Sequence, residues 1–256
     1  ARQRHRGIRA DMSDDLTRDG FLDGAVQAWQ PRVGFRSASD AVLMAAAVPA
    51  KAGETVLELG CGVGVAALCL AHRTGAQVTG VELEPLYATL ALRNGVDVVQ
   101  GNVATLPPEI RARSFHHVMF NPPYYAAGAG SDAETVHRAV AMREKLPLID
   151  WLDSAVRRAL PGGSVTVILG ADRLPDILSV CDDRLGRIVV RPLCSRVETP
   201  AKRVIFQATK GARSPFTLLP PLVLHDGKTH VQDGNDASRD AVNILRCGGK
   251  LAMTAT

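Results

Sequence analysis

The sequence has little of what would point to a disulfide framework, a zinc site or a membrane protein. Its five cysteines are an odd number and none forms a C-x-x-C pair, which argues against disulfides and against zinc. No apolar run is long enough to span a bilayer; the longest, from Ala41 to Val48, stops at Pro49 and predicts a buried helix. The N-terminus has basic residues but no apolar signal core. We therefore expect a cytoplasmic protein that uses no metal and contacts no membrane.

The glycine-rich segment Glu58–Gly64 also lacks the fingerprint of nicotinamide-binding proteins. A G-x-G-x-x-G motif would place its third glycine at position 65, which is Val65. The segment lies between a predicted strand, Thr55–Leu57, and a predicted helix, Val65–Ala71, where glycines let the backbone pass close to a ligand. The spacing suits S-adenosylmethionine, which has no pyrophosphate and whose ammonium needs an acidic partner such as Glu58. The expected loop residues are Gly60, Cys61, Gly62 and Gly64.

Two further strands are expected to contribute to the same site. Glu82 follows the predicted strand 76–81, and a carboxylate there can bind both ribose hydroxyls, with Leu83 beside it. Glu84 is a competing acid, expected to face solvent or to cap the helix that begins at Pro85. Asn102 follows the predicted strand 96–99 and could accept from the adenine amino group of the cofactor, although a turn asparagine is an equally good interpretation.

Asn121, Pro122, Pro123 and Tyr124 form the most informative motif. They follow the apolar run 118–120, which predicts a buried strand, and the two prolines force a turn at its carboxyl end. Ligands bind at that end of a parallel sheet. The asparagine oxygen and the Pro122 carbonyl can accept both hydrogens of an NH2 group, and Tyr124 can stack on a flat ring. A proline-rich turn with an asparagine cap is the alternative for the motif taken alone.

Together these motifs resemble those of the class I S-adenosylmethionine-dependent methyltransferases. The resemblance covers about residues 30–225, most of one domain. It includes the leading segment Phe35–Met44 and the stretch Leu160–Leu169. With N-P-P-Y, the leading segment is similar to that of bacterial tRNA adenine-N6-methyltransferases that act on a valine tRNA. The resemblance implies an α/β, Rossmann-like sheet that is mostly parallel and has an antiparallel C-terminal hairpin. Asn102 departs from the family, in which an aspartate is common at this position.

A basic segment suggests a nucleic-acid partner. Residues 184–213 contain eight Lys or Arg and one acid, Glu198, a local net charge of +7. Polar and apolar residues alternate in the segment as in the last antiparallel strands of this fold class. Its basic side chains could therefore line a sheet edge and bind the phosphates of a nucleic acid. Protection of an exposed edge strand is the alternative. The residues expected to bind RNA, with tRNA favoured, are Arg191, Arg196, Lys202 and Arg203.

The chain is expected to divide into an N-terminal extension, 1–30, a methyltransferase domain, 31–225, and a C-terminal tail, 226–256. Residues 1–11 would be an upstream extension or a remnant of cloning before a natural start at Met12. Residues 126–145 predict a substrate loop or lid. The tail predicts a loop, a short helix over 238–246 and a frayed end.

These residues predict direct methyl transfer to an amino group. Asn121 and the Pro122 carbonyl would hold the two amino hydrogens, and positioning in line with the methyl would supply most of the acceleration. The N-P-P-Y motif also marks enzymes that methylate DNA adenine, rRNA guanine or a glutamine amide in release factors. The glutamine-amide enzymes carry a separate helical domain, whereas only about thirty residues precede the core here, fewer than a domain needs. A non-catalytic scaffold is the remaining alternative, and the intact motif argues against it.

Overall fold

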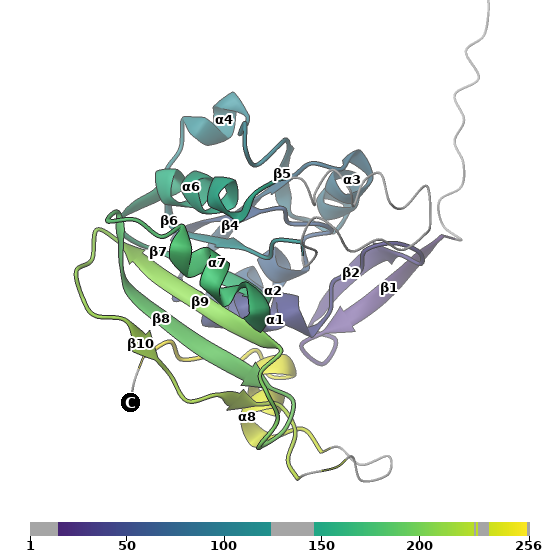
Figure 1. Ribbon diagram of the computed structural model, residues 1–256. Coiled ribbons are helices and arrows are strands. Elements are labelled where there is room, and N and C mark those ends of the chain that lie inside the picture. Colours follow the sequence, from purple (N-terminus) through teal and green to yellow (C-terminus); the bar gives the residue numbers. More distant parts are fainter. Residues whose placement is uncertain (1–14, 124–145, 228, 230–235, 255–256) are drawn as a thin grey trace, which may run out of the picture.

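The computed structural model describes residues 15–123, 146–227, 229 and 236–254 (Figure 1). Within them a nine-stranded sheet runs in the order β10-β8-β9-β7-β6-β3-β4-β5, with β11 also paired to β8, and a separate hairpin joins β1 and β2. The strands are β1 (Leu16–Phe21), β2 (Val26–Pro31), β3 (Thr55–Leu59), β4 (Gln77–Glu82), β5 (Asp97–Gln100), β6 (Phe115–Phe120), β7 (Ala159–Gly170), β8 (Leu185–Cys194), β9 (Arg203–Lys210), β10 (Thr217–Leu218) and β11 (Leu222–Val223). The helices are α1 (Ser39–Ala47), α2 (Val65–Thr74), α3 (Pro85–Arg93), α4 (Pro108–Arg111), α6 (Leu148–Arg158), the 3-10 turn η1 (Ala171–Arg173), α7 (Leu174–Ser179) and α8 (Arg239–Leu245).

The sheet has a parallel part and an antiparallel part. Strands β5, β4, β3, β6 and β7 are parallel neighbours, whereas β9 is antiparallel to both β7 and β8. The predicted class I sheet with an antiparallel C-terminal hairpin is thus confirmed. Because β3, β4 and β6 run in the same direction, the segments that follow Leu59, Glu82 and Phe120 all leave from one edge of the sheet.

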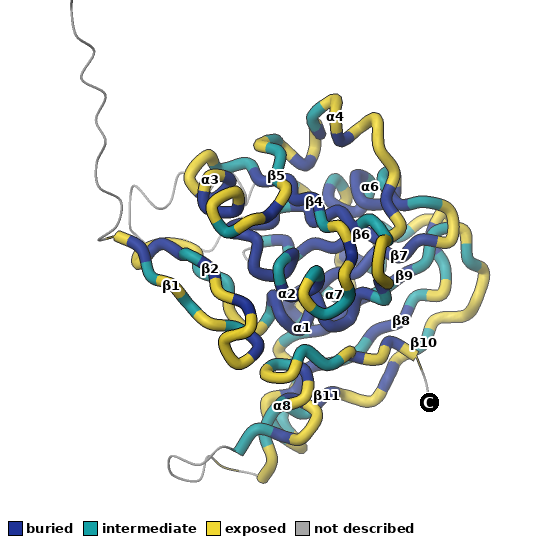
Figure 2. The backbone as a smooth tube through the Cα atoms, turned by 180° about the vertical axis from the view of Figure 1, so that it is seen from behind, coloured by how far each residue is buried: buried dark blue, intermediate teal, exposed yellow. Residues whose placement is uncertain are grey.

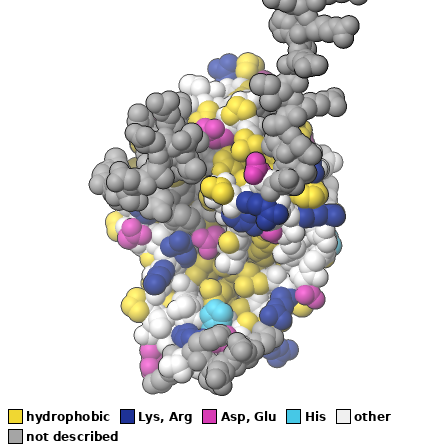
Figure 3. All heavy atoms as spheres, turned by 90° about the vertical axis from the view of Figure 1, so that its right-hand side faces the viewer, with side chains coloured by type: hydrophobic (Ala, Val, Ile, Leu, Met, Phe, Trp, Pro, Cys, Tyr) yellow, Lys and Arg dark blue, Asp and Glu magenta, His cyan; other side chains and the backbone are white. Residues whose placement is uncertain are grey.

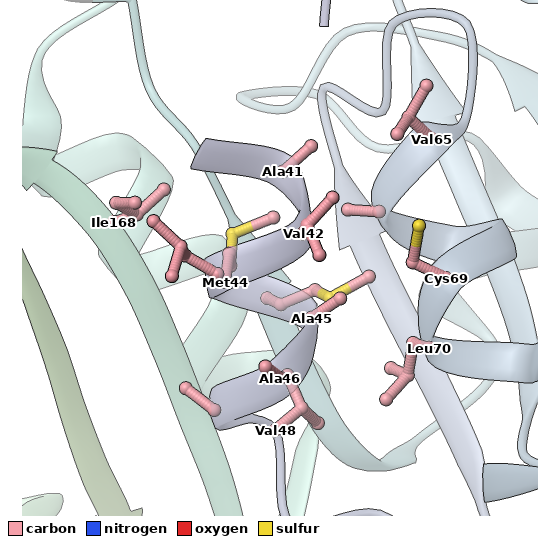
Figure 4. Close-up of a cluster of buried hydrophobic side chains, with 14 of the residues drawn as sticks. Ala41, Val42, Met44, Ala45, Ala46, Val48, Val65, Cys69, Leu70 and Ile168 are labelled. Atoms are coloured by element: carbon pink, nitrogen blue, oxygen red, sulfur yellow. The ribbon is translucent and has the colours of Figure 1, made fainter. Parts of the chain in front are cut away.

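Helices cover both faces of the sheet and bury its apolar side chains (Figures 1 and 2). On one face, α1 packs between the sheet and α2, with Met44 toward Ile168 of β7 and Val42 toward Val65 and Cys69 of α2 (Figure 4). The alanines of α1 have small side chains, so the helix can approach its neighbours closely. All residues of α1 from Ala41 to Ala47 are buried, which confirms the buried helix expected there.

The segments outside the predicted domain pack onto the same core. Leu16 and Val26 of the β1–β2 hairpin and Ile244 of α8 are buried in the cluster that contains α1 and α2. Ser238 caps α8 by accepting from the N–H of Ala241 at 3.1 Å, so the predicted short helix is confirmed.

The predicted frayed end is wrong for residues 251–253. Leu251 and Met253 are buried, and the N–H of Leu251 donates to the Ala46 carbonyl at 2.9 Å. The tail thus anchors itself to α1, although the division of the chain at residues 30 and 225 stays a prediction. No helix in the described part of the chain is long and apolar enough to cross a membrane.

Candidate functional site

The loop between β3 and α2 crosses the carboxyl edge of the sheet in a conformation that needs glycine. Gly60 has φ +66° and Gly64 has φ +87°. A Cβ at Gly60 would lie 2.7 Å from Cη2 of Trp151, and one at Gly64 would lie 2.5 Å from a methyl of Val96. Side chains at either position would therefore collide with buried neighbours as well as strain the backbone. The loop is fixed further because the N–H groups of Gly60 and Cys61 donate to the Val81 carbonyl of β4.

Glu82, at the end of β4, ties the loop to the next strand. Its carboxylate is fully buried, and Oε2 accepts from the N–H of Gly62 at 2.7 Å. Oε1 accepts from the N–H of Glu84 at 2.9 Å. Glu82 therefore lies at the sheet edge predicted for a ribose contact, and it also organises the loop. Glu84 is the N-cap of α3 but makes no side-chain capping hydrogen bond.

Glu58 is a buried carboxylate with an unused oxygen. Its Oε2 has no hydrogen-bond partner among the described residues. Desolvation raises the pKa of Glu58 to about 8, opposed by the donated N–H of Ala67 and assisted by the negative charge of Glu82. An unpaired buried acceptor is energetically unfavourable, so a cationic ligand that reached it would relieve that penalty.

Asn121 leaves the sheet beside the glycine loop. In the parallel register Phe120 of β6 is opposite Leu59 of β3, so Asn121 and Gly60 are the next residues on adjacent strands. The Oδ1 atom of Asn121 is buried and has no partner among the described residues. Pro122 is buried and Pro123 is half-buried, which holds the turn in place. The structure therefore brings the two main motifs together, whereas Tyr124 and the predicted lid at 126–145 lie outside the described residues.

Two aromatic side chains at this site escaped sequence analysis. Trp151 of α6 is 5% exposed, packs against Gly60 and stacks on Phe120 with ring centroids 5.7 Å apart. Phe35 lies against Gly62, and its N–H donates to the Tyr87 hydroxyl at 2.9 Å. Trp151 follows the motif by thirty residues on another element, so no spacing pattern marks it; Phe35 lies in the leading segment, and its contact with Gly62 depends on the tertiary fold.

The remaining predicted cofactor residues make mainly structural contacts. Asn102 is exposed, and its Oδ1 accepts from the N–H of Ala104 at 2.9 Å, as in the turn interpretation. Cys61 is buried, and its Sγ packs so closely on Gly80 that a Cβ at Gly80 would lie only 2.6 Å from it. Its side chain thus packs on the sheet, while Leu83 is half-buried between Glu82 and α3. A role of these three in cofactor binding stays a prediction.

The basic segment is not an exposed sheet edge, contrary to the expectation above. Its strand β8 is covered along part of its length by β10 and β11. Arg191 donates to the carbonyls of Pro220 and Ala252, and Arg196 forms a largely buried ion pair with Asp236. Arg203 pairs with Asp40 at 3.1 Å. Three of the four predicted phosphate ligands therefore hold the C-terminal segment and α1 in place, and of the four Lys202 alone is exposed.

Comparison with known proteins agrees with this geometry. Residues 56–129, which contain the glycine loop, Glu82 and the Asn121 turn, match the family described as "Methyltransferase domain". Over this segment the chain is thus similar to methyltransferase domains, and it shares the Rossmann-like α/β fold of a methyltransferase of known structure. A predicted O-methyltransferase from Agrobacterium tumefaciens superposes with a TM-score of 0.68 at 23% identity, covering 84% of this chain and 100% of that one.

Two curated relatives share the name tRNA1(Val) (adenine(37)-N6)-methyltransferase. The protein from Dickeya chrysanthemi is 28% identical over 199 residues, covering 73% of this methyltransferase and 78% of the relative. The protein from Shewanella halifaxensis is 27% identical over 179 residues, covering 66% and 72%.

The described residues fit S-adenosylmethionine, the methyl donor of this class. Glu58 has a buried oxygen that no described residue binds and that suits a cation, whereas the glycines at 60 and 64 are required by the close packing of Trp151 and Val96. Within the described residues, no group of three or more His, Cys, Asp or Glu side chains could hold a metal ion.

A Glu82→Ala variant is expected to bind S-adenosylmethionine more weakly by about 1–3 kcal/mol, since it removes a charged acceptor and leaves buried donors unpaired. Titration calorimetry with S-adenosylmethionine measures the change, and NAD is expected to give no heat with either protein. Glu84→Ala is the matched control, because the Glu84 side chain makes no capping bond. Unchanged affinity in a folded Glu82→Ala protein would refute the assigned contact.

Proposed function

We propose that this methyltransferase transfers a methyl group from S-adenosylmethionine to the exocyclic amino group of an adenine in RNA. The favoured substrate is tRNA, at a position near the anticodon. The observation that carries the proposal is the buried Oδ1 of Asn121 beside the glycine loop, which none of the described residues binds. An acceptor in that place suits an NH2 group better than a hydroxyl, because it can hold one amino hydrogen while the second is held elsewhere. The similarity to two tRNA1(Val) (adenine(37)-N6)-methyltransferases supports adenine in tRNA as the target.

S-Adenosylmethionine supplies an electrophilic methyl on a sulfonium that is already a good leaving group. When bound, it would give up this methyl to the amino nitrogen, and one amino proton would leave to solvent. Asn121 and the Pro122 carbonyl hold the amino hydrogens and direct the nitrogen lone pair toward the methyl. The residues therefore act by positioning and by favouring a tetrahedral nitrogen, rather than by forming a covalent intermediate. Tyr124 is proposed to stack on the base.

A base in a tRNA loop is the most accessible target for such a site. An adenine inside a duplex has to be flipped out of the stack, whereas an unpaired loop base is already open and can be held on an aromatic face. Three of the four basic residues predicted from the sequence have partners within the protein, and their contact with RNA stays a prediction. The cytoplasmic location expected from the sequence stays a prediction.

The deciding experiment offers labelled S-adenosylmethionine with purified total tRNA and, in a parallel reaction, with release factor. We expect label in tRNA, and N6-methyladenosine after digestion to nucleosides. The protein alternative, methylation of a glutamine amide, predicts label in the release factor alone. Methylated guanosine in place of methylated adenosine would agree with methyl transfer to an amino group but would refute adenine as the target base.

A further inference from the structure

Two arginines, one from the hairpin and one from α3, lie at one indole ring of the hairpin. Arg18 of β1 is directly opposite Trp29 of β2, and its guanidinium carbon lies 5.9 Å from the centroid of the indole. Arg93, in the last turn of α3, brings a second guanidinium to 4.2 Å from the same ring. Arg18 and Arg93 are exposed and Trp29 is half-buried. Two like charges thus converge on one aromatic side chain at the surface.

The hairpin separates its charges between its two faces. Residues alternate along a strand, so Asp19 lies on the face opposite Arg18 and Trp29. There Asp19 is bound by the guanidinium of Arg36 and by the side-chain amide of Gln30. Within the described residues, no ion pair forms at Arg18 or at Arg93. The outer face therefore holds cations that no described carboxylate neutralises.

Each arginine has a structural use, but neither use accounts for the pair. A base in the last turn of a helix favours the helix dipole, and one guanidinium over an indole is a stabilising contact. A second guanidinium at the same ring adds repulsion between like charges, which a polyanion would relieve. Phosphates provide such charge, and stacked arginine and indole planes also suit unpaired bases.

The cluster is connected directly to the cofactor loop. Asn94, the residue after Arg93, accepts from the N–H of Trp29 at 2.8 Å and donates to the carbonyls of Trp29 and Val63. Figure 3 looks at the side of the molecule that the hairpin and α3 present, and Lys and Arg side chains are visible on that face. A nucleic-acid strand bound at Arg18, Trp29 and Arg93 would therefore contact a surface that is fixed relative to the loop that holds Gly60 and Gly64.

We propose that Arg18, Trp29 and Arg93 form a binding surface for the backbone of the RNA substrate. The proposal rests on the function proposed above and adds a docking surface that the basic segment 184–213 was expected to provide. The arginines bind phosphates, and Trp29 holds both guanidinium groups through its indole ring.

The test is binding of total tRNA by Arg18→Gln, Arg93→Gln and the double variant, measured at several salt concentrations. Each glutamine keeps length and polarity but removes one charge. We expect each single variant to weaken binding about 3–10-fold and to lower the salt slope by about one unit, as for one phosphate contact. Arg157→Gln is the matched control, because Arg157 is 67% exposed and pairs with Asp153 on α6. Its affinity for tRNA is expected to stay at the wild-type value.

Two readouts separate the possible failures. S-Adenosylmethionine affinity is expected to be unchanged in all variants, and the thermal midpoint is expected to fall by no more than a few degrees, roughly what the loss of one exposed cation–π contact would cause, which excludes loss of fold as the cause. If wild type methylates tRNA and the double variant binds it with unchanged affinity and salt slope, the docking surface is refuted and the function stands. If wild type neither binds nor methylates tRNA, the proposed function fails and the docking surface with it. Binding of polyglutamate by wild type and the double variant is measured as well. If the double variant loses as much affinity for polyglutamate as for tRNA, the assignment of the surface to RNA is overturned.

Discussion

An Asn121→Ala variant is expected to bind S-adenosylmethionine with nearly wild-type affinity and to lose about 10²-fold or more in turnover on its RNA substrate. The buried Oδ1 of Asn121 has no partner among the described residues, so its removal breaks no hydrogen bond of that atom within them. Its proposed contact is made to the reacting amino group alone, and an interaction of this kind affects the rate more than the affinity for the methyl donor. Single-turnover methylation and calorimetry on the same preparation measure both quantities.

Asn243→Ala, a truncation of an exposed amide on α8, is the matched control and is expected to keep full activity. Asn121→Asp provides a second comparison, since it keeps the shape and an acceptor oxygen but introduces a charge. Full turnover by Asn121→Ala on tRNA would remove the N-P-P-Y motif from the proposed mechanism. A matching loss in S-adenosylmethionine affinity would instead indicate that Asn121 holds the methyl donor rather than the base.

The central fold was predictable because its signals are local. Short apolar runs followed by glycine, an acid or proline mark where β3, β4 and β6 end, and each of these turns lies where the sequence predicts it. Pro85 begins α3 and the glycine loop precedes α2, as helix-start signals require. Parallel strands then bring the predicted residues to one edge of the sheet, because the carboxyl ends of neighbouring strands coincide.

Contacts between side chains that are far apart in the sequence were not predictable. Arg196 pairs with Asp236 forty residues later, and Arg203 pairs with Asp40, so part of the +7 charge counted in the sequence is paired with acids from outside the segment. Trp151 reaches Gly60 only because α6 packs against both β3 and β6. Charge counts over a window report composition, whereas a binding surface depends on which of those charges remain unpaired after folding.

The affinity for S-adenosylmethionine is expected to rise with pH, and Glu58 is the cause. Burial raises the pKa of Glu58 to about 8 in the free protein, so below that pH the group is mostly protonated and neutral. Binding the ammonium of the cofactor favours the ionised form, and the proton has to leave. The sign follows from this linkage: the dissociation constant falls as pH rises toward 8 and levels off above it. Between about pH 6 and about pH 7.5 the expected fall is on the order of tenfold.

Calorimetry across this range, in buffers of different ionisation heat, measures both the affinity and the proton released. A Glu58→Gln variant should bind weakly at every pH and release no proton, because its amide keeps the shape but cannot ionise. Without cofactor, the same variant should be more stable than wild type above about pH 5, since an acid with a raised pKa destabilises the fold at pH values above its unfolded pKa. Glu109→Gln removes an exposed acid on α4 and should leave the pH profile unchanged. A pH-independent affinity in wild type would show that Glu58 does not contact the ammonium, and the unpaired oxygen would then need another ligand.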